Sequence, residues 1–131
     1  MADGAGFELP FARLAGIEIT AAGRDEVRGR MAWREDLCTL GGILHGGALM
    51  TLADSVGAAC AFLNLPEGAS TATIESKTNF LRAVRSGHVE AVATPIHVGR
   101  SSIVVQTDVR DAEGRRVALV TQTQAVIPAA R

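Results

Sequence analysis

The sequence has few of the residues that mark disulfide-rich or metal-binding proteins, with two cysteines and three histidines among 131 residues. Cys38 and Cys60 are too few for a disulfide framework, and neither belongs to a C-x-x-C pair. Cys60 lies in an apolar segment, where a free cysteine behaves as a small hydrophobic residue. The histidines are scattered without the spacing of zinc ligands, so we expect no metal site.

A strong charge of either sign is lacking as well, since the net charge is −1. This balance gives no reason to expect binding to nucleic acid or to an acidic membrane surface. The N-terminus lacks the basic start and apolar run of a signal peptide, and the longest uncharged stretch, 37–53, holds four glycines and His45. We therefore expect a soluble cytoplasmic protein with no membrane partner, in which residues 1–131 form a single domain.

One apolar segment, 45–63, has the sequence HGGALMTLADSVGAACAFL. Its apolar residues leave no polar stripe, which predicts a helix that is buried on every side. The helix is expected to end near Pro66, because proline commonly follows a helix. Upstream, Phe7, Leu9 and Phe11 are expected to dock a short N-terminal segment onto the fold.

The rest of the chain alternates between apolar and polar residues, which is the period of a half-buried strand. An antiparallel hairpin is expected within 15–33 and a loop over 34–44. The strands expected after the helix are 71–84, 89–98, 102–110 and 116–127. These elements predict an α+β fold in which a hairpin and a four-strand meander surround one helix. A single sheet covers only one side of that helix, so a second copy of the chain is expected to cover the rest.

The start of the helix, His45-Gly46-Gly47, is a candidate binding site. The first turn of a helix has free N–H groups and a partial positive charge, and glycine lets a ligand carbonyl approach the backbone closely. Such donors stabilise a developing oxyanion. His45 could orient the loop or donate a hydrogen bond to a substrate. The alternative is that the glycines serve close helix–sheet packing and that His45 is an ordinary loop residue.

Asp54 is the only charged residue within the apolar helix. A carboxylate in such surroundings is costly, which makes it a candidate functional group. It lies nine residues after His45, roughly 13 Å along the helix axis. One chain therefore cannot easily bring Asp54 and its own Gly46 onto one substrate atom, whereas two antiparallel helices from two chains could. The alternative is a structural aspartate that accepts hydrogen bonds from Ser55 or Thr51.

Three motifs together resemble a known family. They are His45-Gly46-Gly47 followed after six residues by Asp54, then Asn79-Phe80-Leu81-Arg82, and later Gly99-Arg100-Ser101. The pattern resembles the hotdog-fold acyl-CoA thioesterases, in particular the phenylacetate-pathway (PaaI-like) branch of the 4-hydroxybenzoyl-CoA thioesterase superfamily, and covers residues 37–126. The resemblance implies an antiparallel sheet of five to six strands wrapped around one long central helix.

The resemblance also implies roles for individual residues. Asp54 would be the general base or nucleophile, and the Gly46 N–H would polarise the thioester carbonyl from the other subunit. His45 would lie beside the thioester, and Thr73 would help to position the attacking water. The residues implied in substrate binding are Thr39, Gly47, Arg82, Gly99, Arg100 and Ser101.

The binding residues include one departure from the family pattern and two candidates for phosphate recognition. Thr39 stands where many relatives have Asn or Gln, so the polar part of the loop differs from the family pattern. Gly99, Arg100 and Ser101 match the turn with which relatives grip the CoA phosphates, and Arg82 is a second candidate for that role. The alternative for both arginines is a solvated surface charge.

The function expected from this resemblance is hydrolysis of an acyl-CoA to the free acid and CoA. CoA is then part of the substrate, and no cofactor is expected. The expected assembly is a homodimer or a dimer of dimers. With no tyrosine and few other aromatics, the pocket should be mostly aliphatic, which fits a short or medium acyl chain or a small aryl group. Two alternatives stay open: a hydratase or dehydratase using Asp36 and His45, and a non-catalytic acyl-CoA-binding module.

Overall fold

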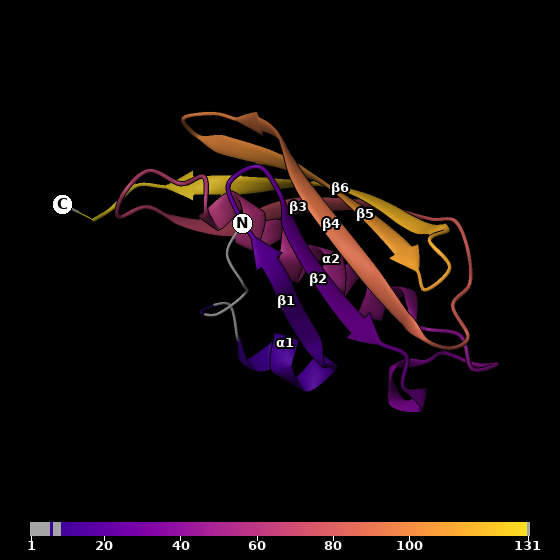
Figure 1. Ribbon diagram of the computed structural model, residues 1–131. Helices are drawn as coiled ribbons and strands as arrows, with labels where there is room; N and C mark the ends of the chain where they lie inside the picture. The colour runs from indigo at the N-terminus through magenta and orange to yellow at the C-terminus, as the bar shows by residue number, and fades with distance from the viewer. Residues whose placement is uncertain (1–5, 7–8, 131) are drawn as a thin grey trace.

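The computed structural model describes Gly6 and residues 9–130, which form one antiparallel sheet around a central helix (Figure 1). The elements in chain order are α1 (Pro10–Ala15), β1 (Ile17–Ala22), β2 (Val27–Ala32), the 3-10 turn η1 (Glu35–Leu37), α2 (Gly46–Phe62), β3 (Ser70–Phe80), β4 (His88–Val98), β5 (Ser102–Asp111) and β6 (Arg116–Ile127). The six-stranded sheet and single long helix are the hotdog arrangement expected from the resemblance.

The strand order is β1-β2-β4-β5-β6-β3, and every neighbouring pair is antiparallel. The predicted four-strand meander is therefore wrong in one respect, because β3 pairs with β6 at the far edge and β2 pairs with β4. The connection from β3 to β4 passes across the start of α2, where the Leu44 N–H donates to the Val84 carbonyl at 2.9 Å. Alternation along a strand predicts which side chains face the core but not which strand lies next to it.

The N-terminal helix α1 is not predicted by the sequence pattern. Pro10 occupies its first turn, where a missing N–H costs nothing, and Gly16 ends it in the left-handed conformation with φ of 76°. Ala12 and Ala15 of this helix are buried, whereas Leu9 and Phe11, which were expected to dock the segment, are 61% and 64% exposed, so that expectation is wrong for these two residues. Phe7, one of the residues expected to dock this segment, lies outside the described residues.

The central helix α2 packs against the inner face of the sheet, and its core-facing residues include Leu52, Val56 and Cys60, each fully buried. The prediction that every side of this helix is buried is wrong for the single chain, because one stripe stays partly exposed. The residues of the stripe, which are half-buried or exposed, are Gly47, Met50, Thr51, Asp54, Ser55, Ala58 and Phe62. No helix in the described part of the chain is long and apolar enough to cross a membrane.

Candidate active site

The Asp54 carboxylate lies between α2 and two strands, and side chains from both strands reach it. The Thr73 hydroxyl on β3 lies 2.8 Å from Asp54 Oδ1, and Nε2 of Gln122 on β6 donates to the same oxygen at 3.1 Å. Among the described residues, Asp54 Oδ2 has no hydrogen-bond partner, and the residue is half-buried. One carboxylate oxygen is therefore held while the other is available to a substrate or a water.

The alternative in which Thr51 or Ser55 satisfies Asp54 is wrong. Thr51 Oγ1 donates to the Gly47 carbonyl and Ser55 Oγ donates to the Thr51 carbonyl, each at 2.8 Å. Both hydroxyls therefore bond backbone oxygens one turn earlier in the helix. The groups that hold Asp54 come from the sheet.

A β-bulge in β3 aims Thr73 at Asp54. Thr73 is paired with Gln124 of β6 and Glu75 with the adjacent Thr123, so Ile74 is an extra residue on β3. A bulge bends its strand and redirects the side chains beside it. Thr73 thereby turns toward the helix, while the Ile74 side chain is 65% exposed. Strict alternation along the predicted strand would not identify this irregularity.

The start of α2 presents a backbone N–H that no described residue uses. Nδ1 of His45 accepts a hydrogen bond from the Gly47 N–H at 2.7 Å, so the His45 side chain caps the helix. The Gly46 N–H has no partner in the described part of the chain. The Phe80 ring lies against this glycine, 3.0 Å from where a Cβ would be. A substrate oxygen can therefore reach this donor without meeting a side chain from Gly46 itself.

Within one chain, the free N–H and the carboxylate are separated. Gly46 and Asp54 are eight residues apart on α2, about 12 Å along the helix axis. The neighbouring strand repeats this separation, because Thr73 contacts Asp54 whereas Phe80 contacts Gly46. Within one chain, the predicted catalytic residues thus fall into two groups, His45 with Gly46 and Thr73 with Asp54.

A surface cavity of about 480 Å³ lies beside the start of α2. Its lining includes the apolar side chains of Phe11, Leu14 and Leu37 together with His45 and Gly47. Asp36, the carboxylate of the hydratase alternative, also lines it, but Asp36 is an exposed residue whose side chain accepts a hydrogen bond from Arg34 Nε at 3.0 Å. The cavity thus places an apolar surface next to the candidate oxyanion donor.

Thr39 lies in the exposed tip of the loop before α2. Its N–H donates to the Ile43 carbonyl at 2.8 Å, and the loop is tied down by Trp33 Nε1, which donates to the Gly42 carbonyl at 3.0 Å. The Thr39 hydroxyl makes no hydrogen bond to any residue that the structure describes. It is not brought into contact with Asp54 or with Gly46.

The two candidate phosphate-binding arginines lie at opposite ends of β6. The Arg82 N–H donates to the Val117 carbonyl, whereas the Val126 N–H donates to a carbonyl of the turn Gly99–Ser101. Val117 and Val126 are nine residues apart on β6, roughly 30 Å along an extended strand. Neither Arg82 nor Arg100 has an ion-pair partner among the described residues, and both are exposed. One chain therefore cannot place both arginines on one phosphate group.

The cysteines are poor candidates for a nucleophile. Burial raises the pKa of the Cys60 thiol to about 11. Burial and the neighbouring charges of Glu35 and Asp36 raise the pKa of Cys38 as well. Because the thiolate is the reactive form, both cysteines stay largely unreactive at neutral pH. In the described part of the chain, no group of three or more His, Cys, Asp or Glu side chains is placed to hold a metal ion.

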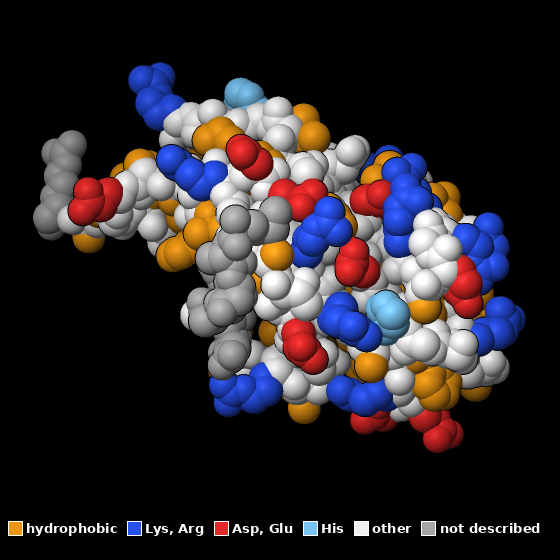
Figure 2. Space-filling view, viewed as in Figure 1, with side chains coloured by type: hydrophobic (Ala, Val, Ile, Leu, Met, Phe, Trp, Pro, Cys, Tyr) orange, Lys and Arg blue, Asp and Glu red, His pale blue; other side chains and the backbone are white. Residues whose placement is uncertain are grey.

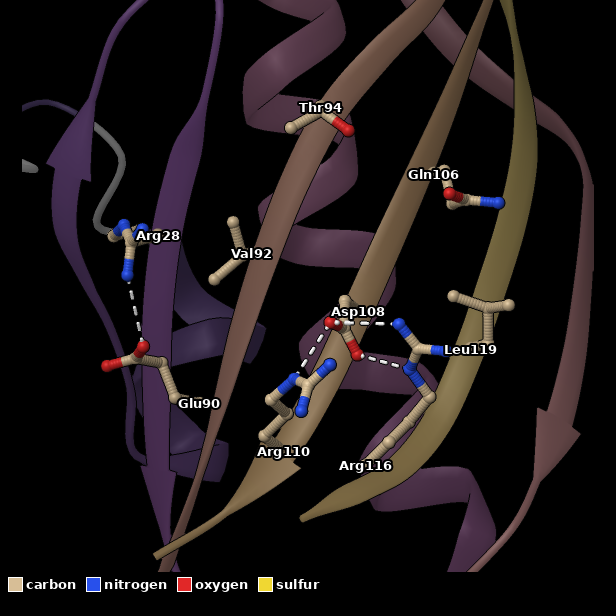
Figure 3. A pocket seen from close by; sticks show the side chains of 9 residues that line it. All are labelled: Arg28, Glu90, Val92, Thr94, Gln106, Asp108, Arg110, Arg116 and Leu119. Carbon is tan, nitrogen blue, oxygen red and sulfur yellow. Dashed lines mark hydrogen bonds and ion pairs between the residues drawn. The ribbon is translucent and has the colours of Figure 1, made fainter. Parts of the chain in front are cut away.

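A second cavity lies on the outer face of the sheet, away from α2 (Figure 3). Figure 2 shows acidic and basic side chains interspersed over this face. Burial raises the pKa of Asp108, but the hydrogen bonds and charges of Arg116 and Arg110 outweigh it and hold the pKa below its ordinary value. Arg28 likewise lies 2.8 Å from Glu26 and 3.3 Å from Glu90. These charges are already paired, so this cavity offers no free acid or base.

The sequence prediction missed two residues of the Asp54 site, Gln122 and Gln124. Both are almost completely buried, with 0% and 1% exposure. They lie in the run Thr121–Gln124, where every residue is polar, so alternation gives no sign of which face is buried. The sequence does contain one signal: the two glutamines are two residues apart in a predicted strand, so their side chains lie on the same face of the sheet.

Comparison with known proteins places these features in context. A sequence model of the thioesterase superfamily matches residues 41–118. The proofreading thioesterase EntH of Cronobacter turicensis is 34% identical over 101 residues, which cover 77% of this chain and 74% of that protein. A thioesterase structure from Haemophilus influenzae superimposes with a TM-score of 0.89 and 35% identity, covering 95% of this chain and 87% of the other. A mutant thioesterase structure from Pseudomonas aeruginosa superimposes with a TM-score of 0.86 and 31% identity, covering 90% of this chain and 86% of the other.

Proposed function

Because this chain belongs to the thioesterase superfamily, we propose that it hydrolyses an acyl-CoA thioester at a site shared by two subunits. The observation that carries the proposal is that two reactive atoms have no hydrogen-bond partner among the described residues. Asp54 is held through Oδ1, and its Oδ2 is free among the described residues. The Gly46 N–H is likewise unused in the described part of the chain. These are the two groups that water-mediated thioester hydrolysis requires.

In the proposed reaction, Asp54 Oδ2 takes a proton from a water as the water oxygen attacks the thioester carbonyl carbon. The carbonyl oxygen becomes an oxyanion and accepts a hydrogen bond from the Gly46 N–H at the positive end of α2. The intermediate then collapses, the carbon–sulfur bond breaks, and CoA leaves as a thiolate that takes up the proton held by Asp54, which restores the carboxylate. Only water and residues of the chain take part, since CoA arrives as part of the substrate.

The separation of Gly46 from Asp54 supports a shared site. If Gly46 of one chain lies opposite Asp54 of a second chain, the two-fold axis passes near the midpoint of these residues, Met50. On β3 the corresponding contacts are Phe80 and Thr73, and their midpoint lies between Ser76 and Lys77. Helix and strand lie side by side, so one axis serves both elements. A two-fold dimer is also the commonest closed assembly.

The surface that such a dimer would cover is exposed and partly apolar in the single chain. β3 is an edge strand of eleven residues, and a long exposed edge invites pairing with another strand. Ile74 and Phe80 on this strand are 65% and 51% exposed. Met50 and Ala58 of α2 lie on the partly exposed helix stripe. Two copies paired through β3 and α2 would bury this surface, and the resemblance extends the proposal to a dimer of dimers.

The acyl group is proposed to occupy the cavity beside the start of α2. Phe11, Leu14 and Leu37 line this cavity next to His45 and the helix N-terminus. A carbonyl at the Gly46 N–H would therefore have an apolar surface within reach of its acyl chain. The lining fits a short or medium aliphatic chain or a small aryl group.

Hydrolysis can be tested with a panel of acyl-CoAs of increasing chain length and several aryl-CoAs, with free CoA measured by a thiol reagent. We expect release of CoA and of the free acid in equal amounts. Mass spectrometry of the same mixtures separates the alternatives, since a hydratase would add or remove one water and a binding module would leave the substrate unchanged. Either of those results would contradict the proposal.

Arg100 provides a test of CoA recognition. It is exposed at the turn between β4 and β5 and has no ion-pair partner among the described residues. We expect Arg100→Ala to raise KM for acyl-CoA with little change in kcat, because a remote phosphate contact is equally strong in the ground and transition states. The effect should vanish with an acyl-pantetheine, which lacks the nucleotide phosphates. An equal loss on both substrates would show that Arg100 acts through the reaction centre or the fold.

A further inference from the structure

Gln122 makes an unusual use of a buried amide. Both N–H bonds of its Nε2 are occupied, one by Asp54 Oδ1 at 3.1 Å and one by Gln124 Oε1 at 2.9 Å. Its own Oε1 is buried and has no hydrogen-bond partner among the described residues. Leaving a buried carbonyl without a donor is costly, so a glutamine that only filled space here would be a poor choice.

The charge of Asp54 explains the orientation of this amide. Turning the Gln122 amide over would place its carbonyl oxygen against the Asp54 carboxylate and also against Oε1 of Gln124, so that acceptors would face acceptors at both contacts. The observed orientation therefore leaves Oε1 of Gln122 without a partner and gives the carboxylate an N–H donor. Hydrogen bonds to charged groups are stronger than those between neutral groups.

Gly57 makes room for this arrangement. A Cβ on residue 57 would overlap Gln122 Oε1 and would lie 2.6 Å from Cδ of the same side chain. Glycine in the interior of a helix is ordinarily unfavourable relative to alanine. Its presence one turn after Asp54 lets the amide pass close to the helix backbone and reach the carboxylate.

Gln124 connects this contact to β3. Its Oε1 accepts from Gln122 and lies 2.6 Å from the Thr73 hydroxyl, and its Nε2 donates to Thr71 Oγ1 at 3.1 Å. The Thr73 hydroxyl has one proton, so at any moment it donates either to Gln124 or to Asp54. The Gln122 N–H is therefore the donor to Asp54 that does not depend on the Thr73 rotor.

We infer that Gln122 is a positioning residue that fixes Asp54 through Oδ1 so that Oδ2 faces the reacting groups. Its side chain packs against Gly57 and is held by the hydrogen bond to Gln124. This inference rests on the proposed hydrolysis for its kinetic consequence, but the contact itself does not. Gln122 touches no reacting atom, so its removal should change the rate of the chemical step rather than substrate binding.

The kinetic test replaces Gln122 with methionine, which has a similar length and no N–H donor. We expect kcat of Gln122→Met to fall roughly 10- to 100-fold, the scale of a hydrogen bond to a charged group, while KM stays within about twofold. Gln106→Met is the matched control, because Gln106 lines the cavity on the outer face of the sheet (Figure 3). A kcat within twofold of the unaltered protein for Gln122→Met would overturn the inference.

Gly57→Ala tests the Gln122–Asp54 contact by a substitution on the helix. The added Cβ should displace the Gln122 amide and lower kcat in the same direction. The same change made in a Gln122→Ala background should cost nothing further, because the side chain that it displaces is already absent. Additive losses in the double variant would show that Gly57 acts by another route, and would count against the inference.

A measurement without substrate separates this inference from the proposed function. The side-chain amide signals of Gln122, assigned in a glutamine-labelled nuclear magnetic resonance spectrum by their loss in Gln122→Met, should shift when Asp54 is changed to asparagine. Gln106 signals should not move. If the Gln122 signals also stay fixed, the contact is refuted, whatever the protein hydrolyses. If they shift while no acyl-CoA is hydrolysed, the contact stands and the proposed hydrolysis and the kinetic role of Gln122 fail together.

Discussion

Asp54→Asn is expected to lower kcat for acyl-CoA hydrolysis by at least about 10²-fold, the scale of a positioned general base. Asparagine keeps the size of the side chain and an oxygen that can accept from Thr73 and Gln122, which lie 2.8 and 3.1 Å from Oδ1. It removes the group that can take a proton from water. The measurement is steady-state hydrolysis of the best substrate from the acyl-CoA panel.

The thermal midpoint of Asp54→Asn should stay close to that of the unaltered protein, because Asp54 is half-buried and its two donors keep an acceptor. Ser55→Ala is a matched control one residue away, since among the described residues Ser55 Oγ bonds only the Thr51 carbonyl. We expect Ser55→Ala to retain full activity. An Asp54→Asn protein that is folded and turns over near the normal rate would remove Asp54 from the mechanism.

Gly46→Pro is expected to cost about 10²- to 10³-fold in kcat, the usual result of removing one oxyanion donor. Proline at the first position of a helix lacks only the N–H in question and has the right φ for the helix. The preceding residue, His45, has an extended backbone with φ of −62° and ψ of 136°, which suits a residue before proline. The substitution therefore removes the donor while keeping the helix.

Gly46→Ala separates the N–H from the crowding beside it. Alanine keeps the donor, and its Cβ would lie 3.0 Å from the ring of Phe80, a residue that is 51% exposed and has room to shift. We expect Gly46→Ala to be much more active than Gly46→Pro. Equal losses in both variants would mean that space at this glycine, rather than its N–H, controls the rate.

The sequence was sufficient to predict the central helix and the last strand closely. The predicted helix 45–63 is observed as Gly46–Phe62, and the strand 116–127 is observed as Arg116–Ile127. The helix is one continuous apolar segment, and the strand has apolar residues on both sides of its polar run 121–124, so the extent of each element could be predicted. Strand order could not be predicted in the same way, because the position of β3 beside β6 depends on a connection that crosses the helix start.

The Asp54 site, too, could be predicted from the sequence only in part. A carboxylate in an apolar helix is visible in the sequence, and so is its distance from the glycines at the helix start. The bulge that aims Thr73 and the inward direction of Gln122 are not visible, since both depend on the register between β3 and β6. Asp54 was also expected to be buried in a helix covered on every side, whereas the single chain leaves it half-buried on an open stripe.

The shared site is the central claim, and mixed dimers test it most directly. Asp54→Asn chains and Gly46→Pro chains, each inactive alone, are combined in equal amounts under conditions of subunit exchange, with mixing followed by native mass spectrometry. A mixed dimer then has one site with both groups intact, so recovery of about one quarter of full activity is expected for random pairing in a two-fold dimer.

The companion mixture combines unaltered chains with chains that carry both substitutions. A shared site predicts that every mixed dimer is inactive, which leaves about one quarter of full activity, whereas a site within one chain predicts about one half. Recovery in the first mixture together with the lower value in the second is the result that the account predicts. Confirmed exchange with no recovery in the first mixture and one half in the second would contradict it.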